Sequence, residues 1–370
     1  MGDEQLTWVA LNLALAPNAL VLQNLLERFG RPDAILAAKG PALAEVRGVT
    51  PRLVRRLGDH RLLEAAAAEV RRARRLSIRI LLRDDPGFPG ILFQLPDPPP
   101  LIYMRGDLRE ADDPAVAVVG SRRATPYGLE MAGRLASEIA AAGVTVVSGL
   151  ARGIDEAAHR GALEAGGRTL AFLGSGLDRI YPRESARLAE RISNAGAVLS
   201  EFPLGTAPLA GNFPVRNRLI SGVARGTLVV EAAPRSGSLI TARMALEQGR
   251  DVFAVPGNAT VTTARGSNLL IQQGAKLVMC GRDVLEEIPE VILPPEASGE
   301  PAEARAGSEE EEHILRHLPL AEPVALEDLA RVTEIGAGPL LAALLKLEMD
   351  ERVKQLAGCR FVRTRRGNVG

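Results

Sequence analysis

The sequence predicts an α/β protein whose parallel sheet occupies the middle of the chain, preceded by short helices and followed by a small second domain. Three observations support this fold class. Apolar runs of strand length recur between residues 116 and 231, each followed by a turn that contains glycine. The first turn leads into an amphipathic helical pattern, Tyr127–Ala142. A proline- and glutamate-rich stretch near residue 300 has the composition of a linker.

The first apolar run, Val116–Val119, meets a Gly-Ser-Arg-Arg turn just before this helical pattern. Gly120 and Ser121 allow close approach of the backbone to a ligand, and the free N–H groups and the helix dipole favour an anion. Arg122 and Arg123 add charge-assisted donors. Neither G-x-G-x-x-G nor G-x-x-x-x-G-K-[ST] is present here, so the turn indicates an anion site but neither a dinucleotide site nor a Walker-type ATP site.

Three further predicted strands end in turns of the same kind: Val144–Val147, Thr169–Leu173 and Leu228–Glu231. The turns after the last two contain the candidate site residues Gly174, Arg183, Arg235, Ser236 and Gly237. Because ligands bind beyond the carboxyl ends of the strands in open α/β sheets, we expect the turns to converge on one crevice. The alternative is a purely structural role, since glycine and serine are ordinary turn residues.

Between the last two predicted strands, an aromatic residue stands beside glycine and arginine. The candidates here are Gly211, Phe213, Arg216 and Arg218. A base can stack on an aromatic ring while guanidinium groups hold phosphates, as nucleic-acid strands require. The alternatives are that Phe213 belongs to the core and that Arg216 or Arg218 pairs with Glu201 or Glu231. The neighbouring glycine, asparagine and proline favour a loop position for Phe213.

The net charge is zero, but its distribution is uneven. Residues 116–282 contain 19 Lys and Arg against 12 Asp and Glu, whereas residues 283–370 contain 10 against 18. Because phosphate binding depends on local clusters, the basic middle is consistent with a nucleic-acid site. An asymmetric surface without such a site is the alternative.

The composition argues against several other classes of protein. No apolar run approaches the roughly 20 residues of a membrane span, and no signal-like segment opens the chain, so we expect a cytoplasmic protein. Cys280 and Cys359 are far apart, which indicates neither a disulfide framework nor a thiolate metal site. The helical pair His313 and His317 has no third ligand nearby and is interpreted as a solvated helix face. We therefore expect no metal and no cofactor.

Both flanks of the predicted sheet have their own organisation. Residues 1–76 are expected to form an N-terminal domain of short helices, in which Thr50 caps a helix that opens with Pro51 in a helix-hairpin-helix pattern. The sheet domain is expected over 77–288 and a flexible linker over 289–308. Residues 309–370 then show three helical patterns and two short strands, which predict a winged helix.

Six motifs together resemble one known family, the DNA-processing protein A (DprA/Smf) family. They are GSRR, SGLARGID, GSGLDRIYP, FPVRNRLISG, EAAPRSGSLITA and AVPGN, in the family's order over roughly residues 84–283. The resemblance implies an extended Rossmann-like sheet, an N-terminal domain of the SAM or helix-hairpin-helix type and a C-terminal winged helix. It also implies a homodimer that binds single-stranded DNA without hydrolysing it and helps load RecA recombinase in natural transformation. Whether duplex DNA is also bound is left open.

Carried over residue by residue, the family's DNA pocket corresponds to Ser121, Arg122, Arg183, Gly211 and Phe213. Ala210 departs from the family, in which many members place a lysine just before the glycine of this segment, and Arg216 or Arg235 is a candidate to replace that charge.

Two other functions have to be compared with this one. Phosphoribohydrolases of similar fold have P-G-G-x-G-T-x-x-E where this chain has Glu231-Ala-Ala-Pro-Arg-Ser-Gly-Ser-Leu, and the catalytic glutamate falls near Thr241, with no acid until Glu247. We therefore expect no enzymatic activity. The other alternative is a scaffold with a vestigial crevice, whose terminal domains bind the DNA.

Overall fold

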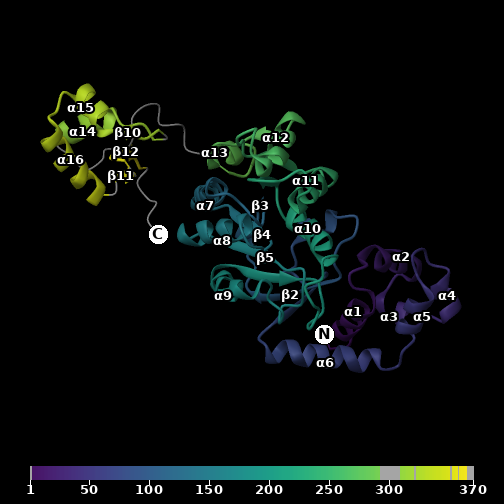
Figure 1. Cartoon of the computed structure of the whole chain (residues 1–370). Helices are drawn as coiled ribbons and strands as arrows, with labels where there is room; N and C mark the ends of the chain where they lie inside the picture. Colours follow the sequence, from purple (N-terminus) through teal and green to yellow (C-terminus); the bar gives the residue numbers. More distant parts are fainter. Residues whose placement is uncertain (1, 292–308, 321, 351, 357, 365–370) are drawn as a thin grey trace. The chain divides into compact units, whose positions relative to one another are not determined.

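The computed structural model describes residues 2–291, 309–320, 322–350, 352–356 and 358–364. The chain divides into two compact units, Met1–Leu293 and Pro294–Gly370 (Figure 1). The predicted linker, residues 289–308, lies outside the described residues from position 292 onward. The predicted fold class, a mainly parallel α/β sheet with flanking helical parts, is confirmed.

The first unit is organised around one sheet of nine strands in the order β1-β2-β6-β5-β4-β3-β7-β8-β9. The four predicted strands are β3 (Ala115–Val119), β4 (Thr145–Ser148), β5 (Thr169–Phe172) and β7 (Gly226–Val229). The others are β1 (Arg79–Leu82), β2 (Leu101–Gly106), β6 (Ala197–Ser200), β8 (Asp251–Ala254) and β9 (Lys276–Leu277). Strands β3 to β9 pair in parallel, whereas β2 pairs antiparallel with both β1 and β6.

The strand order creates a switch point at β3. From β3 the chain continues outward through β4, β5 and β6, and then returns to the opposite side of β3 with β7, which continues to β8 and β9. In open α/β sheets a crevice opens beyond the carboxyl ends of the strands where the winding reverses in this way. The turn after β3, residues 120–123, lies at that point.

Both faces of the central strands are buried, so these strands are mainly apolar, with a few buried threonine and serine residues, and do not alternate with exposed polar residues. Val116 and Val118 pack with α7 (Pro126–Ala141) and α8 (Ile154–Glu164), whereas Ala117 and Val119 share a core with the helices of the opposite face. That opposite face is covered by α10 (Asn212–Gly222) and α11 (Gly237–Glu247), as Figure 1 shows. The remaining elements near the sheet are α9 (Ala186–Ala195), α12 (Arg265–Gln272), α13 (Gly281–Leu285), and the short 3-10 helices η1 (Gly90–Gln94), η2 (Glu110–Asp112), η3 (Arg183–Ser185) and η4 (Thr262–Ala264).

Six helices precede the sheet: α1 (Gly2–Leu15), α2 (Ala19–Phe29), α3 (Pro32–Ala37), α4 (Gly40–Ala44), α5 (Pro51–Leu57) and α6 (Leu62–Arg75). The predicted cap of α5 is present, because the Leu53 N–H donates to the Thr50 hydroxyl at 3.3 Å. Trp8 and Leu11 of α1 share one hydrophobic core with Leu101 and Tyr103 of β2. The helices therefore belong to the same compact unit as the sheet, and α6 ends next to the predicted boundary at residue 76.

The second unit has the predicted winged-helix composition. Its helices are α14 (Glu309–Arg316), α15 (Leu326–Thr333) and α16 (Ala337–Met349), and its antiparallel strands are β10 (Val324–Ala325), β11 (Val353–Leu356) and β12 (Arg360–Arg363), in the order β10-β12-β11. The sequence predicted the β11 and β12 strands but not the two-residue β10. Ile314, Leu329, Leu344 and Phe361 form the centre of a small core of its own.

Among the described residues, none of the helices is both long and apolar enough to cross a membrane. The part of the chain that the structure describes also lacks any group of three or more His, Cys, Asp and Glu side chains arranged to hold a metal ion.

Candidate nucleic-acid interface

A cavity of about 670 Å³ lies at the switch point, beyond the carboxyl ends of β3 and β7; we refer to it as the strand-end cavity. Its walls come from the turns after β3, β4 and β7 and from the first turns of α10 and α11. Of the twelve candidate residues, eight line this cavity: Gly120, Ser121, Arg122, Phe213, Arg216, Arg235, Ser236 and Gly237. Three of the four predicted turns, those after β3, β4 and β7, therefore converge on one crevice, whereas the turn after β5 does not line it.

Phe213 lies in the wall of the strand-end cavity and is half-buried, so it is not part of the core, but it stands in the first turn of α10 and not on the predicted loop. The guanidinium carbon of Arg122 sits 4.8 Å from the centre of its ring, which is a cation–π distance. Gly174 makes room for the ring from below, because a Cβ at that position would lie only 2.9 Å from Cδ1 of Phe213. The strand-end glycine after β5 thus positions the aromatic ring without lining the cavity itself.

Arg122, Arg123 and Arg235 are exposed and supply the cations of the strand-end cavity. Ala210, the expected departure from the family pattern, also lines the cavity and contributes no charge. Of the two arginines considered as replacements for the expected lysine, Arg235, on the turn after β7, is the exposed one.

Arg216 has a different environment, because its side chain is buried with only 3% of the residue exposed. Its Nη1 donates to the carbonyl oxygen of Gly149 at 2.7 Å and also to that of Phe172. Burial lowers the pKa of the guanidinium to about 10. Gly149 is required at its position, because a Cβ there would lie 2.5 Å from Nη1 of Arg216. Arg216 therefore lines the floor of the cavity and joins the carboxyl ends of β4 and β5 there, a structural role in place of the predicted phosphate contact.

Arg218 does not line the strand-end cavity. It is 6% exposed and forms ion pairs with Glu201 at 2.5 Å and with Asp97 at 3.0 Å. Burial raises the pKa of Glu201 to about 7, although the neighbouring guanidinium acts in the opposite direction. The alternative of pairing with Glu201 thus describes Arg218, and its predicted phosphate contact is corrected as well.

The two remaining candidates are exposed but lie outside the cavity lining. Arg183 opens η3, directly after Tyr181 and Pro182, which line a smaller neighbouring cavity. Gly211 precedes α10, and a Cβ added to it would meet nothing within 4 Å. Space therefore does not require glycine at position 211.

Two buried carboxylates were missed as parts of the site. Glu231, at the end of β7, accepts hydrogen bonds from the Thr125 N–H at 2.9 Å and from its hydroxyl at 2.6 Å. This contact fixes the start of α7 and hence the turn that contains Arg122.

Asp155, in the first turn of α8, lines the cavity and accepts a hydrogen bond from the Ala151 N–H at 3.3 Å. Burial raises its pKa, and the nearby guanidinium of Arg216 lowers it. In the sequence, Glu231 follows a strand-end motif and Asp155 follows a glycine-rich motif, and these positions could have indicated their roles.

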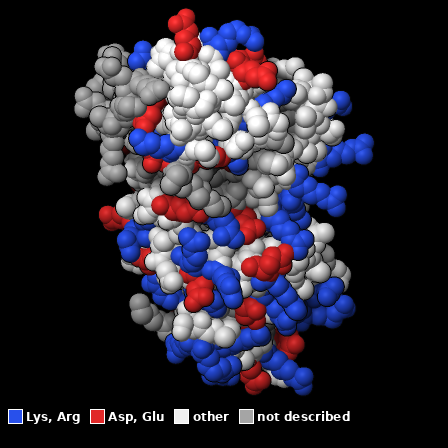
Figure 2. Space-filling model, turned by 60° about the vertical axis from the view of Figure 1, so that its left-hand side comes forward, with Lys and Arg blue, Asp and Glu red and all other residues white. Residues whose placement is uncertain are grey.

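The charged surface by itself does not locate the site. Lys and Arg side chains are spread over much of the face drawn in Figure 2, with Asp and Glu among them. The positive excess of residues 116–282 is thus distributed, whereas the strand-end cavity brings cations together with a ring and backbone turns.

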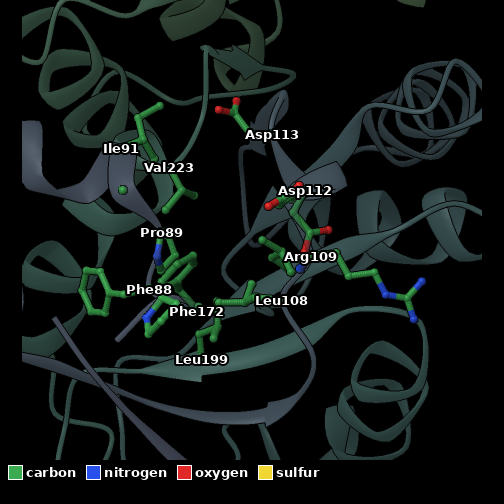
Figure 3. Close-up of a pocket in the computed structure, with 15 residues that line it drawn as sticks. Phe88, Pro89, Ile91, Leu108, Arg109, Asp112, Asp113, Phe172, Leu199 and Val223 are labelled. Carbon is green, nitrogen blue, oxygen red and sulfur yellow. Dashed lines mark hydrogen bonds between the residues drawn. The ribbon is translucent and has the colours of Figure 1, made fainter. Parts of the chain in front are cut away.

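Another cavity, of about 440 Å³, has the opposite character (Figure 3). Phe172 and Leu199 form its apolar floor, and Asp112 and Asp113 lie on its rim, while the side chain of Arg109 extends away from it. Both carboxylates are ion-paired, Asp112 with Arg168 and Asp113 with Arg225, so this cavity offers an apolar floor and no cluster of available cations for a nucleic-acid strand.

The fold and the strand-end cavity define a Rossmann-like α/β protein with an arginine-lined crevice and a separate winged helix. Comparison with known proteins identifies the family within this class. The sequence profile of the DNA recombination-mediator protein A family matches residues 79–289, and that of the DprA winged helix domain matches residues 297–359. The chain belongs to this family, the DprA/Smf family, which confirms the resemblance seen in its motifs.

Similar proteins cover most of the chain. Protein Smf of Synechocystis sp. is 33% identical over 98% of this chain and 99% of its own length. The X-ray structure of DNA processing protein A from Streptococcus pneumoniae has a TM-score of 0.66 and 37% identity, covering 75% of this chain and 95% of that one. A structure of the Helicobacter pylori protein, described for its single-stranded DNA binding mode, has a TM-score of 0.51 and 31% identity, covering 56% of this chain and 93% of that one.

Proposed function

We propose that this chain is a recombination mediator that binds single-stranded DNA in the strand-end cavity without hydrolysing it. The observation that carries the proposal is the arrangement of Phe213, Arg122 and Arg235 around one cavity at the switch point. An aromatic ring offers a stacking surface to any base, and exposed guanidinium groups bind phosphates. N–H groups of the turn after β3 and of the first turn of α11 add neutral donors for phosphate oxygens.

The contact between Arg122 and Phe213 can be exchanged for contacts with DNA when a single strand binds. A cation–π contact at an exposed position contributes about 0.5–1 kcal/mol, whereas stacking of a base on an aromatic residue contributes about 1–3 kcal/mol. A base that displaces the guanidinium from the ring therefore gains more than is lost. The released Arg122 then binds the adjacent phosphate, so one residue gives up a weaker contact for a charge-assisted one.

The wider role of the family is proposed for this chain on the strength of its membership. We infer that it acts in the cytoplasm as a homodimer, protects the incoming single strand during natural transformation and helps to load RecA recombinase. Little base preference is expected, because stacking accepts every base and phosphate contacts carry no sequence information. The winged helix is expected to serve protein contacts or dimer support as much as DNA, since α16 is largely apolar with Lys346 as its one basic residue.

The first test is the binding of fluorescent oligo-dT to the full chain across a salt series. With phosphate contacts from Arg122, Arg183 and Arg235, the slope of log K against log salt should be about −2, at about −0.7 per contact on a single strand. Arg122→Ala should flatten the slope by about 0.7, and Phe213→Ala should weaken binding with the slope unchanged.

Arg109→Ala is the matched control for Arg122→Ala, because it removes an exposed arginine that lies beside the acidic rim of the other cavity. It should bind like the wild type. If Arg122→Ala and Phe213→Ala also bind like the wild type, the strand-end cavity is not the DNA site. Release of free base from a nucleoside monophosphate would instead support a phosphoribohydrolase, in spite of Thr241 at the position of the catalytic glutamate.

A further inference from the structure

A smaller cavity of about 210 Å³ adjoins the strand-end cavity, and we refer to it as the side cavity. The two cavities share Arg122, Arg123, Ala151 and Phe213, so they meet at the Arg122–Phe213 contact. Among the residues that line only the side cavity is Tyr181, whose ring forms one of its walls. A strand bound in the strand-end cavity therefore has a direct continuation past Arg122 toward Tyr181.

Tyr181 is exposed in a way that core packing does not explain. It follows the long turn after β5, and 46% of the residue is accessible to solvent, whereas Pro182 next to it is buried. Its ring centre lies 6.0 Å from that of Phe213, with an angle of 44° between the ring planes. The buried proline holds the end of the turn on the protein, and the tyrosine ring stays open beside cationic side chains. An exposed ring on a basic surface is the arrangement that single-stranded nucleic-acid sites use for stacking.

The geometry of the two rings determines what they can hold. Stacked neighbouring bases in a DNA strand are parallel and about 3.4 Å apart. Rings that are 6.0 Å apart and tilted by 44° cannot each stack on one of two bases that remain stacked on each other. They can hold two neighbouring bases that have separated. The phosphate between those bases then falls at the shared border of the cavities, where Arg122 and Arg123 lie.

We propose that Tyr181 is a second stacking platform, so that the site holds two successive nucleotides, one base on Phe213 and the next on Tyr181. This inference rests on the proposed function and extends the site by one nucleotide into the side cavity. Tyr181 is thereby a positioning residue for single-stranded DNA, because paired and stacked strands do not present two splayed neighbouring bases.

The charge of the side cavity supports a nucleotide there. Arg152, which also lines it, forms an ion pair with Glu184, and both side chains are largely exposed. Ion pairs between exposed side chains contribute little, so a phosphate oxygen can replace the carboxylate at small cost. The side cavity thus offers a ring and an available cation, which are the two parts that the strand-end cavity offers to the first nucleotide.

The test is the affinity of the full chain for fluorescent 20-nucleotide oligo-dT in four variants: Tyr181→Ala, Tyr181→Phe, Phe213→Ala and Tyr127→Ala. Loss of one stacking contact, at about 1–3 kcal/mol per base, corresponds to a weakening of about 5- to 150-fold. We expect such a loss in Tyr181→Ala with the salt slope of the wild type, and near wild-type affinity in Tyr181→Phe, which keeps the ring. Tyr127 is the matched control, since it is equally exposed at 45% and lines neither cavity. Thermal melting of each variant verifies the fold.

The outcomes separate this inference from the proposed function. If Tyr181→Ala binds like the wild type while Phe213→Ala is weakened, the second platform is refuted and the single-nucleotide site stands. Equal loss in Tyr181→Ala and Tyr181→Phe also refutes stacking, because it assigns the contribution to the hydroxyl group. If Phe213→Ala and Arg122→Ala both bind like the wild type, the proposed function itself fails.

Discussion

Replacement of Arg216 distinguishes a buried structural arginine from a phosphate-binding one. In Arg216→Met the carbonyl oxygens of Gly149 and Phe172 lose their buried donor. Each unsatisfied buried acceptor costs about 1–3 kcal/mol, so the free energy of unfolding should fall by about 2–6 kcal/mol. Asp155, whose pKa burial already raises, also loses the cation that lowers it, so its carboxyl should titrate still higher.

This loss corresponds to a clear shift in the melting temperature. Unfolding entropy is about 2.1 cal/mol/K per residue, which gives roughly 0.6 kcal/mol/K for the first unit, and the midpoint should fall by about 3–10 °C. Calorimetry and circular dichroism measure it directly. Arg122→Met is the matched control, because it removes the same charge from an exposed position and should melt like the wild type. The interpretation is refuted if Arg216→Met melts like the wild type and instead flattens the salt slope of DNA binding as Arg122→Met does.

Three further predictions follow from the packing. Gly174→Ala would place a Cβ 2.9 Å from the Phe213 ring and should weaken oligo-dT binding with little change in melting, whereas Gly211→Ala, whose Cβ meets nothing within 4 Å, should bind like the wild type. Burial lowers the pKa of His159 to about 3, whereas in the unfolded chain it is about 6.5. The free energy of unfolding should therefore decrease as the pH is lowered below about 6.5, by about 2 kcal/mol at pH 5. Urea unfolding at pH 7 and pH 5 measures this loss, and an equal loss in His159→Asn would assign it to other groups. Thr50→Ala removes the cap of α5 and should cost about 1 kcal/mol in the same assay, with Thr7→Ala, away from any helix cap, as the control.

The sequence by itself determined the local architecture. The apolar run of β3, its glycine turn and the helix α7 follow from patterns within some twenty residues, and so do the cap at Thr50 and the three helices of the second unit. These elements depend on backbone propensities and on periodic burial, which neighbouring residues specify. The six family motifs also identified the family, because their order along the chain is specific.

Only the tertiary structure decided which candidate residues face the cavity. Arg122 and Arg216 look alike in the sequence, but Arg216 is buried by the carboxyl ends of β4 and β5, and Arg218 by Glu201. The ring of Tyr181 meets that of Phe213 across more than thirty residues of chain. The physical reason is the strand order, because the chain returns to the other side of β3 and brings together residues that are distant in the sequence. These distant contacts decide whether a charged side chain is buried or remains in water.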